Sequence, residues 1–305
     1  MPETLRVTSP SRVSLDELSE HLGRGVNFSN EQYVFELAPL LAGLAADPDL
    51  LSAHITRQLA AYQEGFQRDN PYLAGNLILA RGNGFTIRAN LWHPAADDAL
   101  EDGQRRRLQP YEVLHDHDFS FLTVGYEGPG YFTELYECDP ESIEGYPGEK
   151  VDLRYLGRDS LPAGKVMYFR ARRDVHSQQL PDALSISLNI LIENPEDTLR
   201  HRYVFDDDHR IVEISGVEQE ARLFLCDLAG LLGDENTFDR LRALAQNHPT
   251  PQLRARALGA MHRLSPKSAA EIAELGAGDR SRLVREAALA IGKGPDPRTK
   301  GSTSR

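Results

Sequence analysis

The sequence predicts a mainly-β protein in which helices flank a β-barrel, and three observations lead to that prediction. Residues 1–68 carry apolar side chains at helical spacing. Residues 69–215 change to short runs rich in Val, Ile, Phe and Tyr, which Gly, Pro and Asp interrupt. Helical spacing returns over residues 216–293, and residues 294–305 have the composition of a disordered tail. Many short strands without intervening helices favour a double-sheet jelly roll.

The composition argues against several classes of function. The chain has 305 residues with 34 Lys and Arg, 46 Asp and Glu and a formal charge of -12, which disfavours a nucleic-acid partner. The longest apolar run, 37–46, is interrupted by Pro39 and is about half of a membrane span, so no membrane association is expected. The first residues lack the design of a signal peptide, and a cytoplasmic location is expected. Cys138 and Cys226 form no CxxC pair, so neither a disulfide framework nor a thiolate zinc site is predicted.

The N-terminal region predicts three helices. Ser14 precedes Glu17 by three residues and Ser29 precedes Gln32 by three, and both pairs fit the capping box. Helically spaced apolar residues follow each pair, and a third helix is predicted over 50–66. These apolar faces indicate packing and not chemistry.

The central region predicts ten strands. Two of them flank the acidic triplet 206–208, which is typical of a solvated hairpin turn. The predicted strands are 76–80, 85–92, 112–115, 119–126, 131–137, 151–157, 165–170, 183–192, 201–205 and 211–214.

The C-terminal region contains an internal repeat. Leu223, Leu253 and Leu283 follow one another at intervals of 30 residues. Thr250-Pro251 and Ser265-Pro266 each place a capping hydroxyl before a proline at the first helical position. The region resembles short HEAT-like helical repeats, which would pack on the barrel or on the N-terminal helices. The helical regions are candidates for binding a protein partner or a second copy of the chain.

The pattern that carries chemistry is His115-Asp-His117. Residues two apart on a strand share a face, so the two imidazoles converge on one side. His176, at the end of a later predicted strand, is the best-placed third ligand. Imidazole ligands suit Fe, Ni, Cu and Zn, and Mn also remains possible, so the pattern alone does not name the metal. The other seven histidines are interpreted as surface or capping residues.

These residues also resemble a known family. The run from His115 to Gly125, with Glu134-Leu-Tyr136-Glu137 after it, resembles the first metal motif of the cupin superfamily. It is most similar to the cysteine-dioxygenase-like thiol dioxygenases, over about residues 70 to 195. Leu161, 15 residues before His176, and the strand beginning at Ala183 resemble the second motif. The resemblance implies a double-stranded β-helix, Fe(II) bound by three neutral histidines, and O2 as a substrate.

The chain departs from this family at several positions. The arginine that binds the substrate carboxylate would fall near Gly75, and Leu122 stands where some members carry a cysteine linked to tyrosine. Ser185 fits the first member of the family's Ser-His-Tyr relay, but Ser187 and Asn189 stand where the relay would continue. Free cysteine is therefore not the expected substrate.

Strand parity supplies the remaining candidate site residues. Tyr168 and Ser185 are the candidate catalytic residues. Tyr168 would be a hydrogen-bond donor near the metal, or else a core aromatic. Arg88 is a candidate replacement for the missing carboxylate clamp, or else part of a surface ion pair. The candidate substrate-binding residues are Arg88, Asn90, Trp92, Phe119, Phe121, Arg170, Ser187 and Asn189.

The sequence thus predicts an Fe(II)-dependent oxygenase. Its substrate is expected to be a small organic acid, thiol, amino acid or peptide other than free cysteine. Two alternatives stay open. One is a non-catalytic cupin that binds a metal or small molecule and presents a helical-repeat interaction module. The other is a metal-assisted isomerase or lyase.

Overall fold

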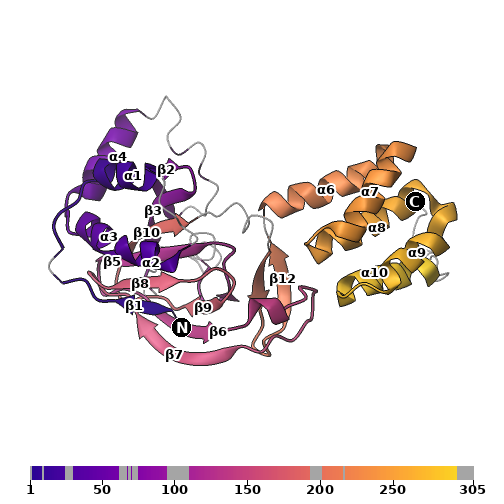
Figure 1. Cartoon of the computed structure of the whole chain (residues 1–305). Coiled ribbons are helices and arrows are strands. Elements are labelled where there is room, and N and C mark those ends of the chain that lie inside the picture. The colour runs from indigo at the N-terminus through magenta and orange to yellow at the C-terminus, as the bar shows by residue number, and fades with distance from the viewer. Residues whose placement is uncertain are drawn as a thin grey trace, which may run out of the picture. The chain divides into compact units, whose positions relative to one another are not determined.

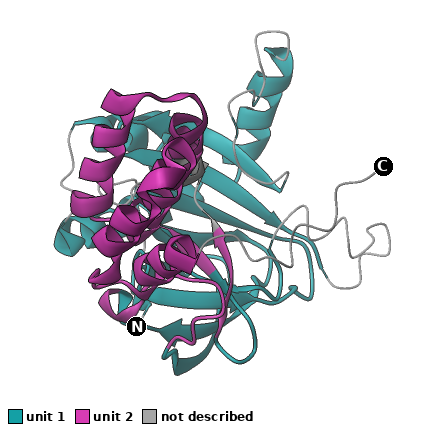
Figure 2. Cartoon of the chain, turned by 90° about the vertical axis from the view of Figure 1, so that its right-hand side faces the viewer, with its two compact units in different colours: residues 1–140, 152–198, 204–209 teal, residues 141–151, 199–203, 210–305 magenta. Residues whose placement is uncertain are grey.

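The computed structural model describes residues 2–8, 10–24, 30–61, 67, 70, 75–94, 110–192, 201–215 and 217–293. The chain forms two compact units, which Figure 2 shows in different colours. The first unit comprises residues 1–140, 152–198 and 204–209, and the second comprises 141–151, 199–203 and 210–305.

Four helices open the first unit: α1 (Leu15–Gly23), α2 (Glu31–Glu36), α3 (Ala38–Ala45) and α4 (Leu50–Ala60). The capping box at α1 is confirmed, since Ser14 Oγ accepts from the Glu17 N–H at 3.2 Å and Glu17 Oε2 accepts from the Ser14 N–H at 2.8 Å. At α2 the cap is Asn30, whose Oδ1 accepts from the Gln32 N–H at 3.0 Å. Ser29, the predicted cap, lies outside the described residues, as do residues 62–66 of the predicted third helix.

The first unit contains a six-stranded antiparallel sheet and most of a second sheet. The first sheet has the order β1 (Glu3–Leu5), β8 (Val166–Phe169), β5 (Ser120–Glu127), β10 (Ser185–Ile192), β3 (Phe85–Trp92) and β2 (Asn76–Gly82). The second sheet includes, in order, β11 (Arg202–Phe205), β4 (Leu114–His115), β9 (Asp174–Gln178), β6 (Phe132–Glu137) and β7 (Arg154–Ser160). The predicted β-sheets with helices before and after them are observed, although the described helices contain more residues than the strands.

The path of the chain between the sheets is that of a jelly roll. Strands β3, β5, β8 and β10 lie in the first sheet and β4, β6, β7 and β9 in the second, so the chain crosses repeatedly from one sheet to the other. The resulting orders are β3-β10-β5-β8 and β4-β9-β6-β7. This arrangement is consistent with the predicted double-sheet architecture, which cupins share with capsid and lectin domains.

The main hydrophobic core of the first unit lies on the outer face of the first sheet. Helix α3 packs against β5 and β10, and α1 packs against β2. Figure 1 shows these helices on the side of the sheet that faces away from β6, β7 and β9. The buried residues of this core on the strands are Leu79, Phe85, Ile87, Ala89, Leu122, Val124, Val166, Tyr168, Leu188, Ile190 and Ile192. A separate aromatic cluster occupies the inner face, and it includes Trp92, Phe121, Met167 and Phe169.

The second unit is mainly helical. After β12 (Ile211–Ser215) it contains α6 (Val217–Leu232), α7 (Glu235–Asn247), α8 (Pro251–Leu264), α9 (Ala269–Ala277) and α10 (Arg282–Lys293). Helix α8 is central, because α6, α7 and α10 all pack against it. Of the repeated leucines, Leu253 is buried, whereas Leu223 and Leu283 are half-buried. Among the described residues, no helix is both long and apolar enough to span a bilayer.

Candidate metal centre

Three histidines meet on the inner face of the second sheet. His115 on β4 lies directly opposite His176 on β9 in the antiparallel ladder, and His117 follows β4. The potential ligand atoms of the three residues all lie within 4.8 Å of one another, and Nε2 of His117 is 3.0 Å from Nε2 of His176. The structure therefore brings together the three side chains that the HxH spacing and strand parity predict.

Local backbone contacts position these imidazoles. Nδ1 of His115 lies 2.8 Å from the carbonyl oxygen of Val113. Because a carbonyl only accepts, this Nδ1 is the protonated ring nitrogen, and Nε2 keeps the lone pair that a metal needs. The carbonyl of His117 accepts from the Arg172 N–H at 2.7 Å, which anchors the segment after β4.

Burial keeps the centre in the form that binds metals. His176 is 0% exposed and His115 is 8% exposed. Burial first, and then the nearby charge of His115, lowers the pKa of His176 well below its ordinary value. The His176 imidazole is therefore neutral at neutral pH.

Aromatic rings surround the histidines. The ring of Phe119 lies 4.9 Å from that of His117, and Phe121 lies 5.1 Å from it. Phe169 stacks on Phe121 at 4.7 Å and contacts His176 at 4.8 Å. The predicted positions of Phe119 and Phe121 beside the histidines are thus observed, and the rings form an apolar wall on that side of the cluster.

The donor set fits a transition metal. Nitrogen ligands with bonds of about 2.1 Å to one ion lie roughly 3.0 to 4.2 Å apart, so the 3.0 Å separation of His117 and His176 matches, and small ring rotations close the rest of the cluster. Three neutral imidazoles suit Fe, Ni, Cu or Zn. No oxyanion from the protein lies in the cluster of described ligand groups.

The inner face of the first sheet adds a polar wall. Arg88 pairs with Asn189 and Asn90 pairs with Ser187 across β3 and β10, so these four side chains share the face of Trp92. The exposed fractions are 5% for Asn90 and 2% for Asn189. Asn90 Oδ1 and Asn189 Nδ2 are buried without a protein hydrogen-bond partner. Arg88 therefore lies on the strand face that points inward, where its side chain is half-buried.

Trp92 closes one end of this wall. Its Nε1–H donates to Ser187 Oγ at 3.0 Å, and its ring lies 4.2 Å from that of Tyr131. Burial raises the pKa of Tyr131, so its phenol keeps its proton. The contact with Trp92 gives Ser187 a structural role, since its hydroxyl orients the indole.

Of the two alternatives for Tyr168, the structure supports the core aromatic and not the hydrogen-bond donor near the metal. Tyr168 pairs with Leu122 on the outer face of the first sheet and packs edge-on against Phe35 of α2, with ring centroids 5.4 Å apart. Burial raises the pKa of Tyr168 to about 12. Its ring belongs to the core beneath the helices, while its neighbours Met167 and Phe169 face inward.

The catalytic role predicted for Ser185 is also not supported by its contacts. Its hydroxyl accepts from the Gly130 N–H at 3.1 Å and donates to the Ala183 carbonyl at 2.9 Å. The bond from Gly130 ties the start of β10 to the loop after β5, and the bond to Ala183 closes the turn that leads into β10. Ser185 is therefore a loop anchor.

Arg170 is committed to carboxylates. Its Nε–H donates to Asp174 Oδ2 at 3.0 Å and an Nη2–H donates to Glu137 Oε1 at 2.9 Å. Burial opposes the charge of Arg170, but Asp174 and Glu137 outweigh it and raise the pKa of the guanidinium. The predicted substrate contact of Arg170 is replaced by this ion-pair network.

Sequence reasoning missed Gln178. It lies two residues after His176 on β9 and shares its face, and its side chain is 5% exposed. The signal was available, because the same period of two that pairs His115 with His117 pairs His176 with Gln178.

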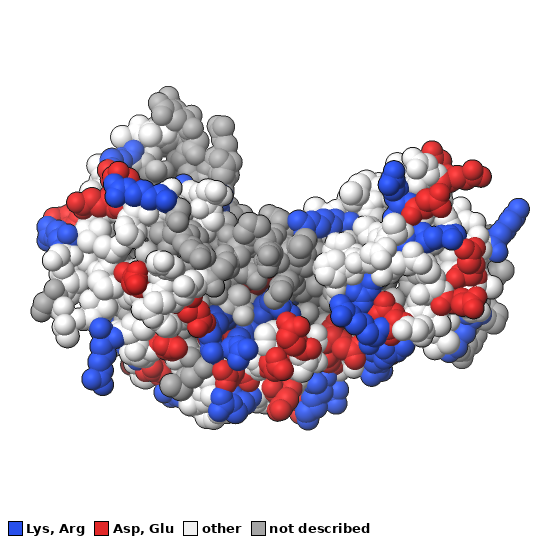
Figure 3. Space-filling view, viewed as in Figure 1, with Lys and Arg blue, Asp and Glu red and all other residues white. Residues whose placement is uncertain are grey.

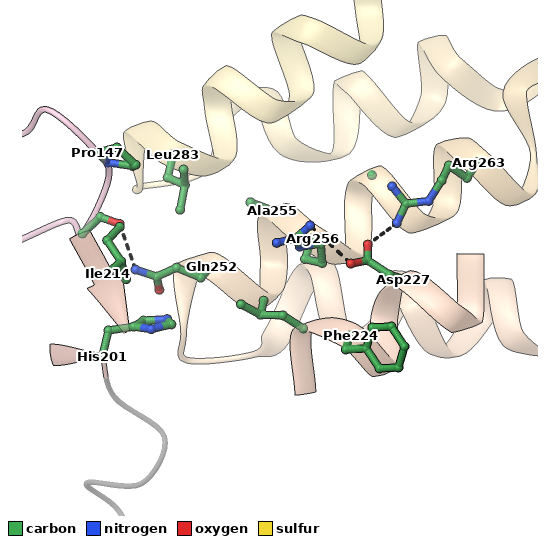
Figure 4. A pocket seen from close by; sticks show the side chains of 13 residues that line it. Pro147, His201, Ile214, Phe224, Asp227, Gln252, Ala255, Arg256, Arg263 and Leu283 are labelled. Atoms are coloured by element: carbon green, nitrogen blue, oxygen red, sulfur yellow. Dashed lines mark hydrogen bonds and ion pairs between the residues drawn. The ribbon is translucent and has the colours of Figure 1, made fainter. Parts of the chain in front are cut away.

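A cavity lies within the second unit, whereas the histidine cluster lies in the first. Its polar side chains are mostly engaged: Asp227 pairs with Arg256 at 3.3 Å and with Arg263, and Gln252 Nε2 donates to the Gly145 carbonyl at 3.0 Å. Figure 4 shows these partners pointing toward one another around the cavity. Because the polar side chains of this cavity already bind one another, the histidine cluster is the stronger candidate for chemistry.

On the face that Figure 3 shows, acidic and basic residues are interspersed.

Comparisons with known proteins identify no family. No family model and no curated protein matches the chain. Hydroquinone 1,2-dioxygenase from Sphingomonas sp. TTNP3 is similar in structure with a TM-score of 0.27 and 11% identity over 41% of this chain and 69% of that one. Salicylate 1,2-dioxygenase from Pseudoaminobacter salicylatoxidans gives 0.26 and 10% over 50% of this chain and 35% of that one. A cupin-superfamily sugar phosphate isomerase from Silicibacter pomeroyi gives 0.24 and 15% over 44% and 68%. Similarities at this level do not establish an activity for this chain.

Proposed function

We propose that the barrel is a metal-dependent oxidoreductase of the cupin type, in which His115, His117 and His176 hold Fe(II). The observation that carries the proposal is the convergence of three imidazoles, two buried and that of His117 half-buried, with ligand atoms within 4.8 Å, inside a jelly roll. Bound there, a reduced iron would supply the activation of dioxygen. Three neutral ligands leave positions for substrate and O2 at the ion.

The surrounding side chains support an oxygenase that acts on a polar substrate. Phe119 and Phe121 lie against the imidazole of His117 and limit the access of water to it. Limiting water suppresses side reactions such as hydrolysis and proton leakage. Asn90 and Asn189 carry buried polar atoms without protein partners, and such atoms are normally satisfied by water or ligand.

The chemistry of that wall narrows the substrate. Arg88 offers a planar fork of donors that matches a carboxylate, and Asn90 and Asn189 offer neutral hydrogen bonds beside it. We therefore assign a small organic acid, amino acid, thiol or peptide carrying a carboxylate, bound with its acid group against β3 and β10. Arg170, Tyr168 and Ser185 take no part in this binding.

The metal assignment is tested by anaerobic purification and metal analysis of the full chain. The expected result is stoichiometric iron in the wild type and at least a 100-fold loss of metal affinity in His176→Ala, because removing even outer-shell partners costs about 10- to 100-fold. His262→Ala in α8 is the matched control and should retain the iron. Equal iron in wild type and His176→Ala would exclude this site.

Oxygen consumption separates catalysis from simple binding. The iron-loaded protein is supplied with O2 and with carboxylate-bearing thiols, amino acids and organic acids in turn. Consumption that depends on one of these substrates and disappears in His115→Ala is expected. If a compound raises the thermal stability of the protein but causes no uptake of O2, the barrel is a binding module and not an oxygenase. Turnover without O2 would indicate an isomerase or lyase.

A further inference from the structure

Gln178 lies beside the three-histidine cluster in a position that strand geometry fixes. It follows His176 by two residues on β9, so both side chains project from the same face. Thr133 on β6 lies opposite Gln178. The backbone carbonyl of Gln178 accepts from the Glu112 N–H at 2.8 Å. The backbone of Gln178 is therefore held on both sides, and its amide is presented to the barrel interior.

The amide end contacts the imidazole of His176. Nε2 of Gln178 lies 3.2 Å from Nε2 of His176 and 3.4 Å from its Nδ1. Two atoms bound to one ion by bonds of about 2.1 Å are about 3.0 Å apart in cis octahedral and about 3.4 Å apart in tetrahedral geometry. The 3.2 Å separation falls within this interval, as does the 3.0 Å between His117 and His176.

Among the described residues, none pairs with the amide oxygen of Gln178. Gln178 is only 5% exposed, and its Oε1 is buried without a hydrogen-bond partner. A buried carbonyl left unpaired is costly, so it normally has a partner that is a water, ligand or ion. The oxygen and nitrogen of a carboxamide have nearly the same shape, and a half-turn about the terminal bond exchanges their positions.

We infer that Gln178 is a fourth protein ligand of the metal, binding through Oε1. The inference rests on the proposed three-histidine site and deepens it. The chain would thus provide three imidazole nitrogens and one neutral carbonyl oxygen, a donor set that keeps the full charge of the ion and suits an Fe(II)-like metal of intermediate hardness. One fewer position would then remain for water, substrate and O2.

Counting the water ligands tests the inference without measuring turnover. The full chain is loaded with Mn(II), and the broadening of its electron paramagnetic resonance lines in water enriched in oxygen-17 reports the number of bound waters. Gln178→Leu, which has a similar shape but no ligand atom, should bind one more water than the wild type. Its Mn(II) dissociation constant should rise by about tenfold or more.

Two further variants control for indirect effects. Gln178→Asn keeps the amide but is one methylene shorter, so it should also gain a water. Gln179→Leu alters the next residue, whose Oε1 accepts from Arg158, and should leave the water count unchanged. If Gln178→Leu does not fold, Gln178→Asn alone decides the result.

The outcomes separate this inference from the proposed function. An unchanged water count in both Gln178 variants, with Mn(II) still lost in His176→Ala, would refute Gln178 as a ligand and leave the histidine site intact. Failure of the wild type to bind Mn(II), Fe(II) or another divalent transition metal would refute the histidine site itself.

Discussion

The two faces of the first sheet have opposite chemistry, although the same strands form both. On β10, Leu188 and Ile190 face the helices and are 0% exposed, whereas Ser187 and Asn189 face the barrel interior. The outer face is a conventional hydrophobic core, and the inner face carries amides, hydroxyls and a guanidinium next to an aromatic cluster. The interior of this jelly roll is therefore organised around chemistry, while the N-terminal helices provide the burial that stabilises the unit.

The energetics of the two faces differ in sign. Each fully buried Leu or Ile contributes roughly 1.5 to 3 kcal/mol to stability. Each buried polar group without a partner costs about 1 to 3 kcal/mol. The outer face thus offsets the cost of keeping unpaired amides inside, and adjacent residues of β10 allow the two contributions to be measured separately.

The largest effect is expected on the outer face. Ile190→Ala removes a side chain that is completely buried under the helices. The free energy of unfolding should fall by about 2 to 5 kcal/mol, because the transfer free energy of the removed atoms is lost and a cavity is left behind. Chemical denaturation measures the loss, and the folded fraction should still bind metal. A loss below about 1 kcal/mol would mean that the helices do not cover this face as described.

The neighbouring inner residue should respond in the opposite direction. Asn189→Leu replaces a buried amide whose Nδ2 has no protein partner with an apolar side chain of similar size. The free energy of unfolding should rise by about 1 to 2 kcal/mol. Metal content should not change, while binding of a carboxylate-bearing substrate should weaken. Destabilisation comparable to that of Ile190→Ala would show that the amide of Asn189 is hydrogen-bonded in the folded protein.

Tyr168 tests the boundary between the faces, with a smaller effect. Because its ring packs against Phe35 on the outer side, Tyr168→Phe should change the free energy of unfolding by less than about 1 kcal/mol. Metal-dependent oxygen consumption should stay within about twofold of the wild type. A large loss of turnover with metal still bound would restore the role predicted from the sequence.

Strand periodicity predicted much of the fold and the metal ligands. The strand 85–92 follows from the alternation of side chains, and the convergence of His115 with His117 was predicted from the same alternation, although the strand ends at His115. Periodicity did not decide which face of β8 points inward, because Val166 and Tyr168 on one face are as apolar as Met167 and Phe169 on the other. The choice depends on where the helices pack, which is a tertiary contact.

Other residues depended on contacts between distant segments. Ser185 is satisfied by Gly130, which is 55 residues away, and Arg170 by Glu137, which is 33 residues away. Neither partner is visible in a local pattern. The position of Gln178, by contrast, followed from the period of two, but an amide after a histidine is not a recognised motif and carried no weight alone.

The smallest change in stability at neutral pH is expected at Glu137, whose carboxylate, unlike the amides of β3 and β10, is paired. A hydrogen bond from Arg154, against the opposing effect of burial and with a further bond from Arg170, lowers the pKa of Glu137 to about 2 from its ordinary 4.5. The unfolded chain binds this proton more readily than the folded chain, so the stabilisation is complete above about pH 4.5 and is lost as the pH falls toward 2. Glu137→Gln should cost about 1 kcal/mol or less at pH 7, because Arg154 is largely exposed. Denaturation of the metal-free protein between pH 7 and 3 should therefore bring the wild type and Glu137→Gln closer together in stability as the pH falls below 4.5. A constant difference across that range would show that the carboxylate is not ion-paired in solution, and the contrast between paired and unpaired polar groups inside the barrel would fail at this point.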